Sequence, residues 1–266
     1  MSGEVSGEVS GEAGRRWTLG LALALASACT PDDLDTRGRV ADYLLPDPYP
    51  RLVIEVDAVE GLTLPDGVSE PLMLAVEELV DKPDGVELVM DQTLAATGRR
   101  WSSDALHELA DARFDLAVDD DTTKLHVLLL DGSYVDGDGD ELLGLQWGHR
   151  HVAMFREGLL SACRTGRGGR GLSSNACQSA ELGVLAHELG HALGLVDNGV
   201  PMVTDHEDPE HRKHTDDPDC VMFWTYERRA VVTRIEETID SGVPAEEAVG
   251  FCAPSLADIE AYKARG

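Results

Sequence analysis

The chain has 266 residues, and 42% of them are hydrophobic, so it can fill the core of one large domain or two small ones. Its 50 acidic residues outnumber its 22 basic residues and give a formal net charge of −28 at pH 7. Because a surface with this charge repels polyanions, the composition excludes nucleic acid as a partner and disfavours direct binding to anionic lipid head groups.

The first 28 residues are interpreted as a low-complexity extension followed by a signal peptide. Arg15 and Arg16 precede the apolar run WTLGLALALASA, which has the length of a signal-peptide core and is too short to span a bilayer. The run ends at ASAC, and small residues directly before a cysteine resemble the lipobox of bacterial lipoproteins. The resemblance implies an exported protein with a lipid on Cys29, anchored to the cell envelope at the outer membrane or cell surface. Ordinary signal cleavage and a buried apolar helix are the alternatives.

Residues 29–50 are rich in Pro and Asp and are expected to form a tether, so that residues 51–266 form the folded domain. Hydrophobic patterns predict helices over Pro71–Val80 and Ser103–Ala112. Apolar runs predict strands at Arg51–Val56, at Val86–Met90, at Lys124–Leu130 and once or twice within Gly144–Phe155. This order predicts an α/β (α+β) fold in which a mixed sheet packs on helices and is complete before residue 181.

The cysteine count is consistent with export. If Cys29 carries a lipid, four cysteines remain, and an even number in an oxidising compartment predicts two disulfides. Three pairings are possible, and proximity in the sequence favours Cys163 with Cys177 and Cys220 with Cys252. A zinc site made only of cysteines is disfavoured, because the chain has no CxxC pair.

The stretch ELGVLAHELGHALGLVD, residues 181–197, has the pattern of a metal site. His187 and His191 are four residues apart, so a helix places both imidazoles on one face, within reach of one ion. Glu188 lies beside them and can take a proton from a water on the metal. The flanking leucines predict a buried helix, where these polar side chains are costly without a metal. Core histidines bound to backbone carbonyls are the alternative. Gly194 can end the helix with a positive φ and turn the chain back beneath the metal.

The pattern HExxHxxG, from His187 to Gly194, resembles the first part of the metzincin signature. This resemblance implies one catalytic zinc ion, a zincin-like twisted mixed sheet and an active-site helix that carries HExxH. It also implies a methionine-containing turn under the site and a C-terminal helical subdomain. The implied activity is hydrolysis of a peptide or protein substrate by a water that Glu188 activates.

The third zinc ligand has two main candidates, Asp197 and His214, with His206 and His211 as lesser alternatives. Asp197 has the metzincin spacing from His191, although the turn-forming sequence after it can hold Asp197 locally without a metal. His214 is followed by Thr215 and then by Cys220-Val221-Met222. This resembles the second half of the archaemetzincin pattern HExxHxxGxxHCxxxxCxM, with an insertion of about seventeen residues after Gly194. We expect His214 to be the ligand, because imidazole is the commoner third ligand, and we expect Met222 to be the turn methionine.

The chain departs from the archaemetzincin pattern at a second zinc site. Thr215 replaces one cysteine of that site and Cys252 has no CxxC partner, so too few ligands remain for a second zinc. His206 and His211 are expected to be residues of a flexible acidic loop, with ligation of a second ion as the alternative. Tyr226 is four residues after Met222, whereas the tyrosine that polarises a carbonyl in some metzincins is two residues after it.

Other side chains suggest sites more weakly. Asp136, Asp138 and Asp140 in DGDGDE resemble half of a calcium loop, but Trp147 occupies the twelfth position of an EF-hand frame, so a solvated turn is favoured over bound Ca²⁺. His149 and His151 alternate like residues of one strand face. Exposed strand positions are favoured for them over positions that line a cleft.

Two classes of function therefore fit the sequence. The first is a zinc metalloendopeptidase that acts outside the cytoplasm. The second is a noncatalytic surface lipoprotein whose structural metal site serves adhesion or ion binding. Glu188 favours the enzyme, because a structural site needs no base and usually has a fourth protein ligand. Substrate preference and oligomeric state have no local signature in the sequence.

Overall fold

A computed structural model describes residues 39–166 and 169–266. The predicted signal peptide, Cys29 and the first part of the predicted tether lie outside these ranges. Within them, no helix combines the length and the apolar character needed to cross a membrane.

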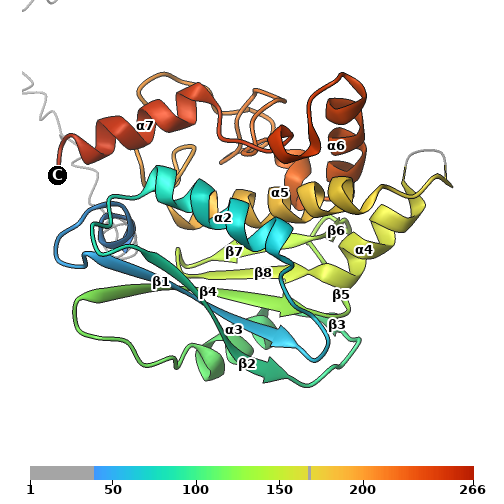
Figure 1. Cartoon of the computed structure of the whole chain (residues 1–266), viewed down its shortest axis with the longest axis horizontal. Coiled ribbons are helices and arrows are strands. Elements are labelled where there is room, and N and C mark those ends of the chain that lie inside the picture. Colours follow the sequence, from blue (N-terminus) through green and yellow to red (C-terminus); the bar gives the residue numbers. More distant parts are fainter. Residues whose placement is uncertain (1–38, 167–168) are drawn as a thin grey trace, which may run out of the picture.

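A five-stranded mixed sheet forms the centre of the molecule, with the strand order β2-β1-β4-β8-β7 (Figure 1). Four strands are parallel, and the edge strand β7 runs antiparallel to β8. The strands are β1 (Arg51–Val59), β2 (Val86–Leu94), β4 (Thr122–Leu130), β7 (Gly144–Trp147) and β8 (His151–Phe155). The predicted mixed sheet is confirmed, and each predicted strand lies within or overlaps an observed one.

A second sheet of three short strands, in the order β3-β5-β6, lies beside the central sheet (Figure 1). It consists of β3 (Arg100–Trp101), β5 (Ser133–Val135) and β6 (Glu141–Leu142). The sequence did not predict these strands, because two or three residues are too few to show an alternating pattern.

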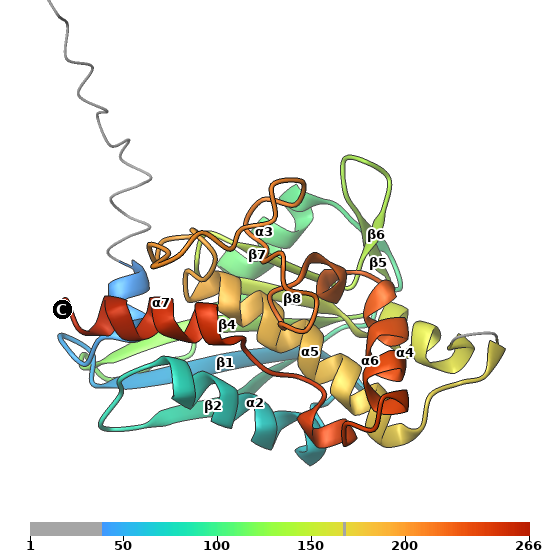
Figure 2. The ribbon, with the colours of Figure 1, turned by 90° about the horizontal axis from the view of Figure 1, so that it is seen from above.

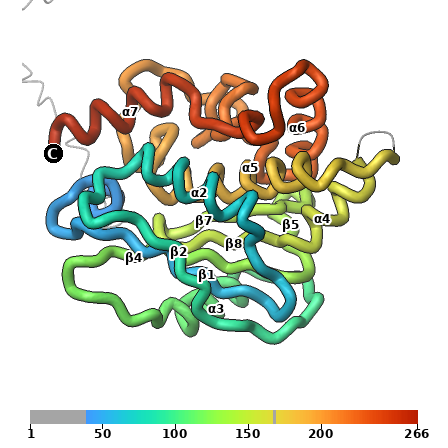
Figure 3. The backbone as a smooth tube through the Cα atoms, viewed as in Figure 1, coloured from blue at the N-terminus to red at the C-terminus, as the bar shows by residue number. Residues whose placement is uncertain are grey.

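Helices cover both faces of the central sheet (Figures 1 and 2). On one face lies α3 (Ser103–Arg113). The other face carries α2 (Asp66–Leu79), α4 (Arg156–Thr165), α5 (Ser174–Ala192), α6 (Ala230–Asp240) and α7 (Ala253–Lys263), with the short helices η2 (Trp224–Glu227) and η3 (Ala245–Glu247). The chain after α5 lies on this same side, as the backbone trace shows (Figure 3). The active-site helix expected from the sequence therefore lies between the sheet and the C-terminal helices.

Each parallel strand contributes side chains to two cores, since successive residues point to opposite faces. In β4, Leu125 and Val127 pack with the helices of the α5 side, whereas Leu128 and Leu130 pack with α3. This explains the continuous apolar run of β4, because a strand covered on both faces does not alternate with polar residues.

The helix predicted over Pro71–Val80 begins five residues earlier, at Asp66. Pro71 lies inside α2 and not at its start. The missing amide of a proline in the second turn removes one helical hydrogen bond, which the packing of Val68 and Leu72 in the core offsets.

The predicted tether is wrong from residue 39 onward. Val40, Tyr43 and Leu44 are at most 1% exposed and belong to the main core. The Lys82 ammonium donates a hydrogen bond to the carbonyl of Asp42 at 2.7 Å. The apolar residues of VADYLL bury their side chains against the domain, so the Pro and Asp content of the segment was misleading.

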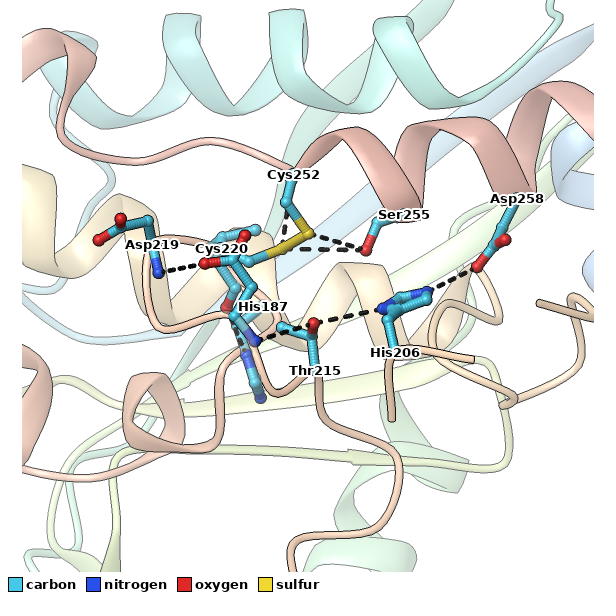
Figure 4. Close-up of a disulfide and its surroundings, with 10 residues drawn as sticks. His187, His206, Thr215, Asp219, Cys220, Cys252, Ser255 and Asp258 are labelled. Carbon is cyan, nitrogen blue, oxygen red and sulfur yellow. Dashed lines mark hydrogen bonds and ion pairs between the residues drawn. A yellow bond between two sulfur atoms is a disulfide. The ribbon is translucent and has the colours of Figure 1, made fainter. Parts of the chain in front are cut away.

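Both predicted disulfides are present. Cys163 and Cys177 join α4 to α5, and Cys220 and Cys252 join the loop before η2 to the start of α7 (Figure 4). The second bond therefore links the predicted methionine turn to the C-terminal helix.

Candidate metal centre

Helix α5 carries the HExxH residues through the interior of the protein. The hydroxyl of Ser173 caps its first turn by accepting a hydrogen bond from the Ala176 amide at 3.2 Å. From Ser179 to Ala192 every residue of the helix is buried. Gly194 ends the helical path with a φ of 90°, and its amide donates to the His191 carbonyl at 3.1 Å. The predicted positive φ at Gly194 is therefore confirmed.

Three imidazoles meet at this helix. His187 Nε2 lies 3.1 Å from His191 Nε2, which lies 3.3 Å from His214 Nε2. Two nitrogens bound to one tetrahedral zinc ion are about 3.4 Å apart, because each zinc–nitrogen bond is about 2.0–2.1 Å long. The three ring nitrogens thus have the separation of ligands that share one ion, and His187, His191 and His214 form a group that could hold a metal.

The protonation of these rings fits a metal site. His187 Nδ1 donates to the Val221 carbonyl at 2.7 Å, which leaves Nε2 as the atom with a free lone pair (Figure 4). Burial, together with the nearby His214, lowers the pKa of His187 to about 4. Burial also lowers the pKa of His191 well below its usual value. Neutral imidazole is the form that binds metal.

Three further polar atoms of these residues have no hydrogen-bond partner in the described part of the chain. They are Glu188 Oε1, His191 Nδ1 and His214 Nδ1, and all three are buried. A buried polar atom without a partner costs about 1–3 kcal/mol, so such atoms call for a ligand or water. Together with the converging Nε2 atoms, the unpartnered Glu188 Oε1 shows that the residues present fit a divalent ion with water beside it.

Glu188 is 1% exposed, and burial, with the negative charge of Glu227 nearby, raises its pKa well above the usual value. Its carboxylate lies against the backbone of Gly144 at the start of β7, where a Cβ atom would overlap Glu188 Oε1. The edge strand and the HExxH helix are therefore in direct contact at the glutamate.

The structure brings His214, and not Asp197, to the two helix histidines. Asp197 is exposed and has a φ of 53°, and its carbonyl accepts a hydrogen bond from the Lys213 ammonium. His214 returns to the centre after the intervening loop, with 11% of its side chain exposed. The identity of the third ligand in solution stays a prediction.

The loop between Asp197 and His214 is held by specific contacts. His206 is 6% exposed, with Nε2 2.8 Å from Asp258 Oδ2 of α7 and Nδ1 3.2 Å from Thr215 Oγ1 (Figure 4). The expectation that His206 is a flexible loop residue is therefore wrong. Its two ring nitrogens have partners on either side of the loop, which fixes the path of the chain just before His214.

His211 and Trp224 make a second contact at this loop. Their rings stack with centroids 4.3 Å apart, and His211 Nδ1 lies 2.8 Å from Asp208 Oδ2. Neither His206 nor His211 belongs to a group of potential metal ligands within the described residues.

The segment after Cys220 passes under α5. Met222 is fully buried, and its sulfur fills the notch at Gly190, where a Cβ atom would overlap it. Tyr226 fills a similar notch at Gly183, where a Cβ would come within 2.6 Å of its ring. Burial raises the pKa of Tyr226 to about 12, and only 2% of its side chain is exposed. Tyr226 therefore packs beneath the helix.

The exposed strand positions predicted for His149 and His151 are wrong. His149 lies in the turn between β7 and β8 with a φ of 48°, and its Nδ1 is 3.2 Å from the Ala192 carbonyl. His151 lies on β8, an inner strand, and its Nδ1 is 3.1 Å from His126 Nδ1. Their side chains are 8% and 9% exposed, because the turn packs on the end of α5 and α3 covers the sheet.

The DGDGDE segment forms the exposed turn between β5 and β6. Asp136 Oδ1 accepts hydrogen bonds from the amides of Asp138 and Asp140 at 3.0 and 2.9 Å. The outer oxygens of Asp136 and Asp140 pair with Arg228 at 3.2 and 2.6 Å. The predicted turn is present, and it faces Arg228, the residue that follows η2.

Glu227 also lies at the centre, and the sequence did not point to it. Its Oε2 is 3.7 Å from His214 Nε2. Burial raises the pKa of Glu227, but His214, His187 and Arg228 outweigh this effect and hold the pKa below its usual value. Glu227 is not part of the sequence pattern that pointed to the histidines, so only the folded structure reveals its place.

No protein-family model matches the chain, and no curated protein matches it either. Among solved structures, it is similar to an archaemetzincin from Methanopyrus kandleri, with a TM-score of 0.51 and 13% identity over 82% of this chain and 97% of that one. A zinc-dependent peptidase from Methanocorpusculum labreanum (strain Z) has a TM-score of 0.48 and 15% identity over 77% and 99%. An archaemetzincin from Archaeoglobus fulgidus, complexed with malonate, has a TM-score of 0.43 and 13% identity over 77% and 99%. The mixed sheet, the helices packed on it and the first of these likenesses show that this chain has the archaemetzincin fold.

Proposed function

We propose that this chain is a zinc-dependent endopeptidase that acts outside the cytoplasm. The observation that carries the proposal is the convergence of His187, His191 and His214 beside a buried Glu188 whose Oε1 has no partner in the described part of the chain. Three imidazoles bind an ion and leave a position open, and an unpaired carboxylate beside that position can accept a proton.

The chemistry divides between the ion and the chain. A bound zinc ion lowers the pKa of a water molecule and polarises the peptide carbonyl. Glu188 accepts the proton of the attacking water and transfers it to the leaving amine. Its carboxylate is buried next to His187 and His191, which places it for both steps. The Val221 carbonyl keeps His187 in the tautomer whose Nε2 faces the centre.

The edge strand supports a peptide as the substrate. Within the described residues β7 pairs only with β8, so its outer backbone groups can pair with an extended chain. Gly144, at the start of β7, touches Glu188. A peptide that pairs with β7 as a further strand would therefore run past the Glu188 carboxylate, with its backbone carbonyls next to the metal centre.

The test is Glu188→Gln, which keeps the shape of the side chain and removes the base. We expect zinc content equal to that of the parent protein and a loss of peptide-library cleavage of about 100-fold or more. Glu70→Gln on the exposed face of α2 is the control and should cleave normally. Undiminished zinc-dependent cleavage by Glu188→Gln would show that Glu188 is not the base. A zinc-loaded parent without any cleavage would favour a noncatalytic surface lipoprotein.

We further propose that Cys29 carries a lipid that anchors the domain to the cell envelope. The support is the ASAC sequence after the short apolar run, and Cys29 lies outside the described residues. Intact-mass analysis of the membrane fraction should find a mature chain that begins at Cys29 with an added acyl mass. A soluble mature chain without that mass counts against the anchor.

A further inference from the structure

Glu227 brings a second carboxylate to the metal centre. Its Oε2 lies 3.7 Å from His214 Nε2. Glu227 also forms, with His187 and Glu188, a set of side chains whose ligand atoms all lie within 4.8 Å of one another. Two ligand atoms of one zinc ion are at most about 4.2 Å apart, twice the metal–ligand distance. The 3.7 Å separation therefore fits two groups that bind the same ion.

The backbone holds η2 next to the edge strand. The Glu227 carbonyl accepts a hydrogen bond from the Leu143 amide at 2.7 Å, and Arg228 forms an isolated antiparallel bridge with Leu142. Because Gly144 follows directly and touches Glu188, this contact fixes Glu227 on the side of the centre where the base lies.

Arg228 and the acidic turn orient the Glu227 side chain. Arg228 Nε is 3.4 Å from Glu227 Oε1, while the outer nitrogens of the guanidinium pair with Asp136 and Asp140 at 3.2 and 2.6 Å. One arginine is thus shared by three carboxylates. Oε1 therefore lies toward Arg228, and Oε2 lies toward His214.

We infer that Glu227 is a fourth protein ligand of the ion in the resting protein and must release it before a substrate can bind. Structural zinc sites are closed by four protein ligands, whereas catalytic sites keep one position open. The ion pair between Glu227 and Arg228 is 3.4 Å long, beyond ordinary hydrogen-bond length, so the carboxylate can move between these two states. The release step rests on the proposed peptidase function, but ligation of the ion does not.

The test compares Glu227→Gln with Glu141→Gln. Glu141 is on β6 of the same region and pairs with Arg229 at 3.3 Å, so it controls for the loss of a nearby negative charge. The zinc dissociation constant is measured by chelator competition, and the visible spectrum of the cobalt(II) form reports the coordination of the ion. We expect Glu227→Gln to raise the zinc dissociation constant about tenfold or more and to change the cobalt spectrum. Glu141→Gln should change neither.

Cleavage at saturating zinc tests the release step. If Glu227 blocks the open position, Glu227→Gln should cleave at least as fast as the parent, whereas Glu188→Gln should not cleave. Unchanged zinc affinity and an unchanged cobalt spectrum would overturn the inference. A loss of cleavage as deep as that of Glu188→Gln would overturn the release step, because Glu227 would then act in the reaction.

Two further results keep these outcomes separate. If Glu227→Gln does not fold, Glu227→Asp takes its place in the test. The aspartate side chain is one carbon shorter and cannot reach as far, so this variant should also bind zinc more weakly than the parent. If the parent binds zinc but cleaves no peptide, the proposed function fails, while the zinc affinity and the cobalt spectrum still decide whether Glu227 is a ligand.

Discussion

Single residues set how closely β7 approaches the HExxH helix. Only a glycine fits at position 144, because a Cβ there would overlap Glu188 Oε1. Glu188 is 1% exposed, so its carboxylate has little free space to move into. The position of the base therefore depends on a residue that carries no chemistry of its own.

Gly144→Ala should displace the Glu188 carboxylate while the three histidines stay in place. We expect zinc content to be kept and cleavage to fall about tenfold or more, since a misplaced base loses part of the 10²–10⁴-fold that it contributes. Peptide cleavage and metal analysis of the purified variant check this. Gly137→Ala is the matched control, because a Cβ there meets no atom within 4 Å. Normal cleavage by Gly144→Ala would contradict the packing argument.

His214→Ala should lower zinc affinity about 100-fold or more, whereas Asp197→Asn should leave it nearly unchanged. The reason is that His214 Nε2 lies 3.3 Å from His191 Nε2, while Asp197 is exposed. Zinc dissociation constants of the two variants measure the difference directly. The reverse ranking would assign the third ligand to Asp197.

The sequence could predict His187, Glu188 and His191 as a unit, because a helix fixes the relation of residues four apart. It could rank His214 above Asp197 only by resemblance. The contact that returns the chain to the centre joins His206 to Asp258, 52 residues away, and such a pair has no local signature.

At the scale of elements, α5 is shaped by two glycines seven residues apart. Gly183 receives the Tyr226 ring and Gly190 receives the Met222 sulfur. Seven residues are about two helical turns, so both notches lie on the face that meets the segment after Cys220. A helix interior normally disfavours glycine by about 1 kcal/mol relative to alanine, and close packing offsets that cost here.

The inner strand β8 makes the stability of the protein depend on pH. Burial, with smaller effects of His126 and Arg150, lowers the pKa of His151 to about 3. At a pH below 6.5, His151 is protonated in the unfolded chain but stays neutral in the folded chain. The free energy of unfolding therefore falls as the pH falls from about 6.5 toward 3. One such group contributes a slope of up to about 1.4 kcal/mol per pH unit.

His151→Gln should remove this contribution and keep a hydrogen-bonding group next to His126. Between pH 6.5 and 4.5, we expect the unfolding free energy of the variant to fall by about 2 kcal/mol less than that of the parent. Urea denaturation of the zinc-free proteins at the two pH values measures it. His107→Gln, which changes an exposed histidine of α3, should behave like the parent. Equal pH dependence in His151→Gln and the parent would show that His151 does not titrate in this way.

The long strands were predictable because runs such as KLHVLLL are apolar without interruption. The short strands β3 and β5 and the start of the domain were not. Residues 39–44 carry their apolar side chains in a segment dominated by Pro and Asp, and only their burial against the rest of the fold reveals their role. Composition averaged over a segment hides a few side chains that are fully buried.

At the scale of the whole molecule, the Cys220–Cys252 bond connects the C-terminal helix to the metal centre. Val221, next to Cys220, binds His187, and Asp258 of α7 binds His206 in the loop that leads to His214. The contacts on either side of the bond thus reach both the first and the third histidine. The Cys163–Cys177 bond instead joins α4 to the first turn of α5, far along the helix from His187.

Replacing Cys220 and Cys252 together by serine should therefore affect stability and zinc binding at once. The bond spans 32 residues, so loop-closure entropy predicts a loss of about 3–4 kcal/mol of unfolding free energy. The matched variant, with Cys163 and Cys177 replaced by serine, opens a span of 14 residues and should lose about 3 kcal/mol. Only the first variant should also bind zinc more weakly, by about tenfold, because the Val221 carbonyl and the His206 loop lose their anchor.

Urea denaturation and chelator competition on both variants measure the unfolding free energy and the zinc affinity separately. Equal zinc affinities in two variants of similar stability would mean that the C-terminal helix stabilises the domain without positioning the histidines.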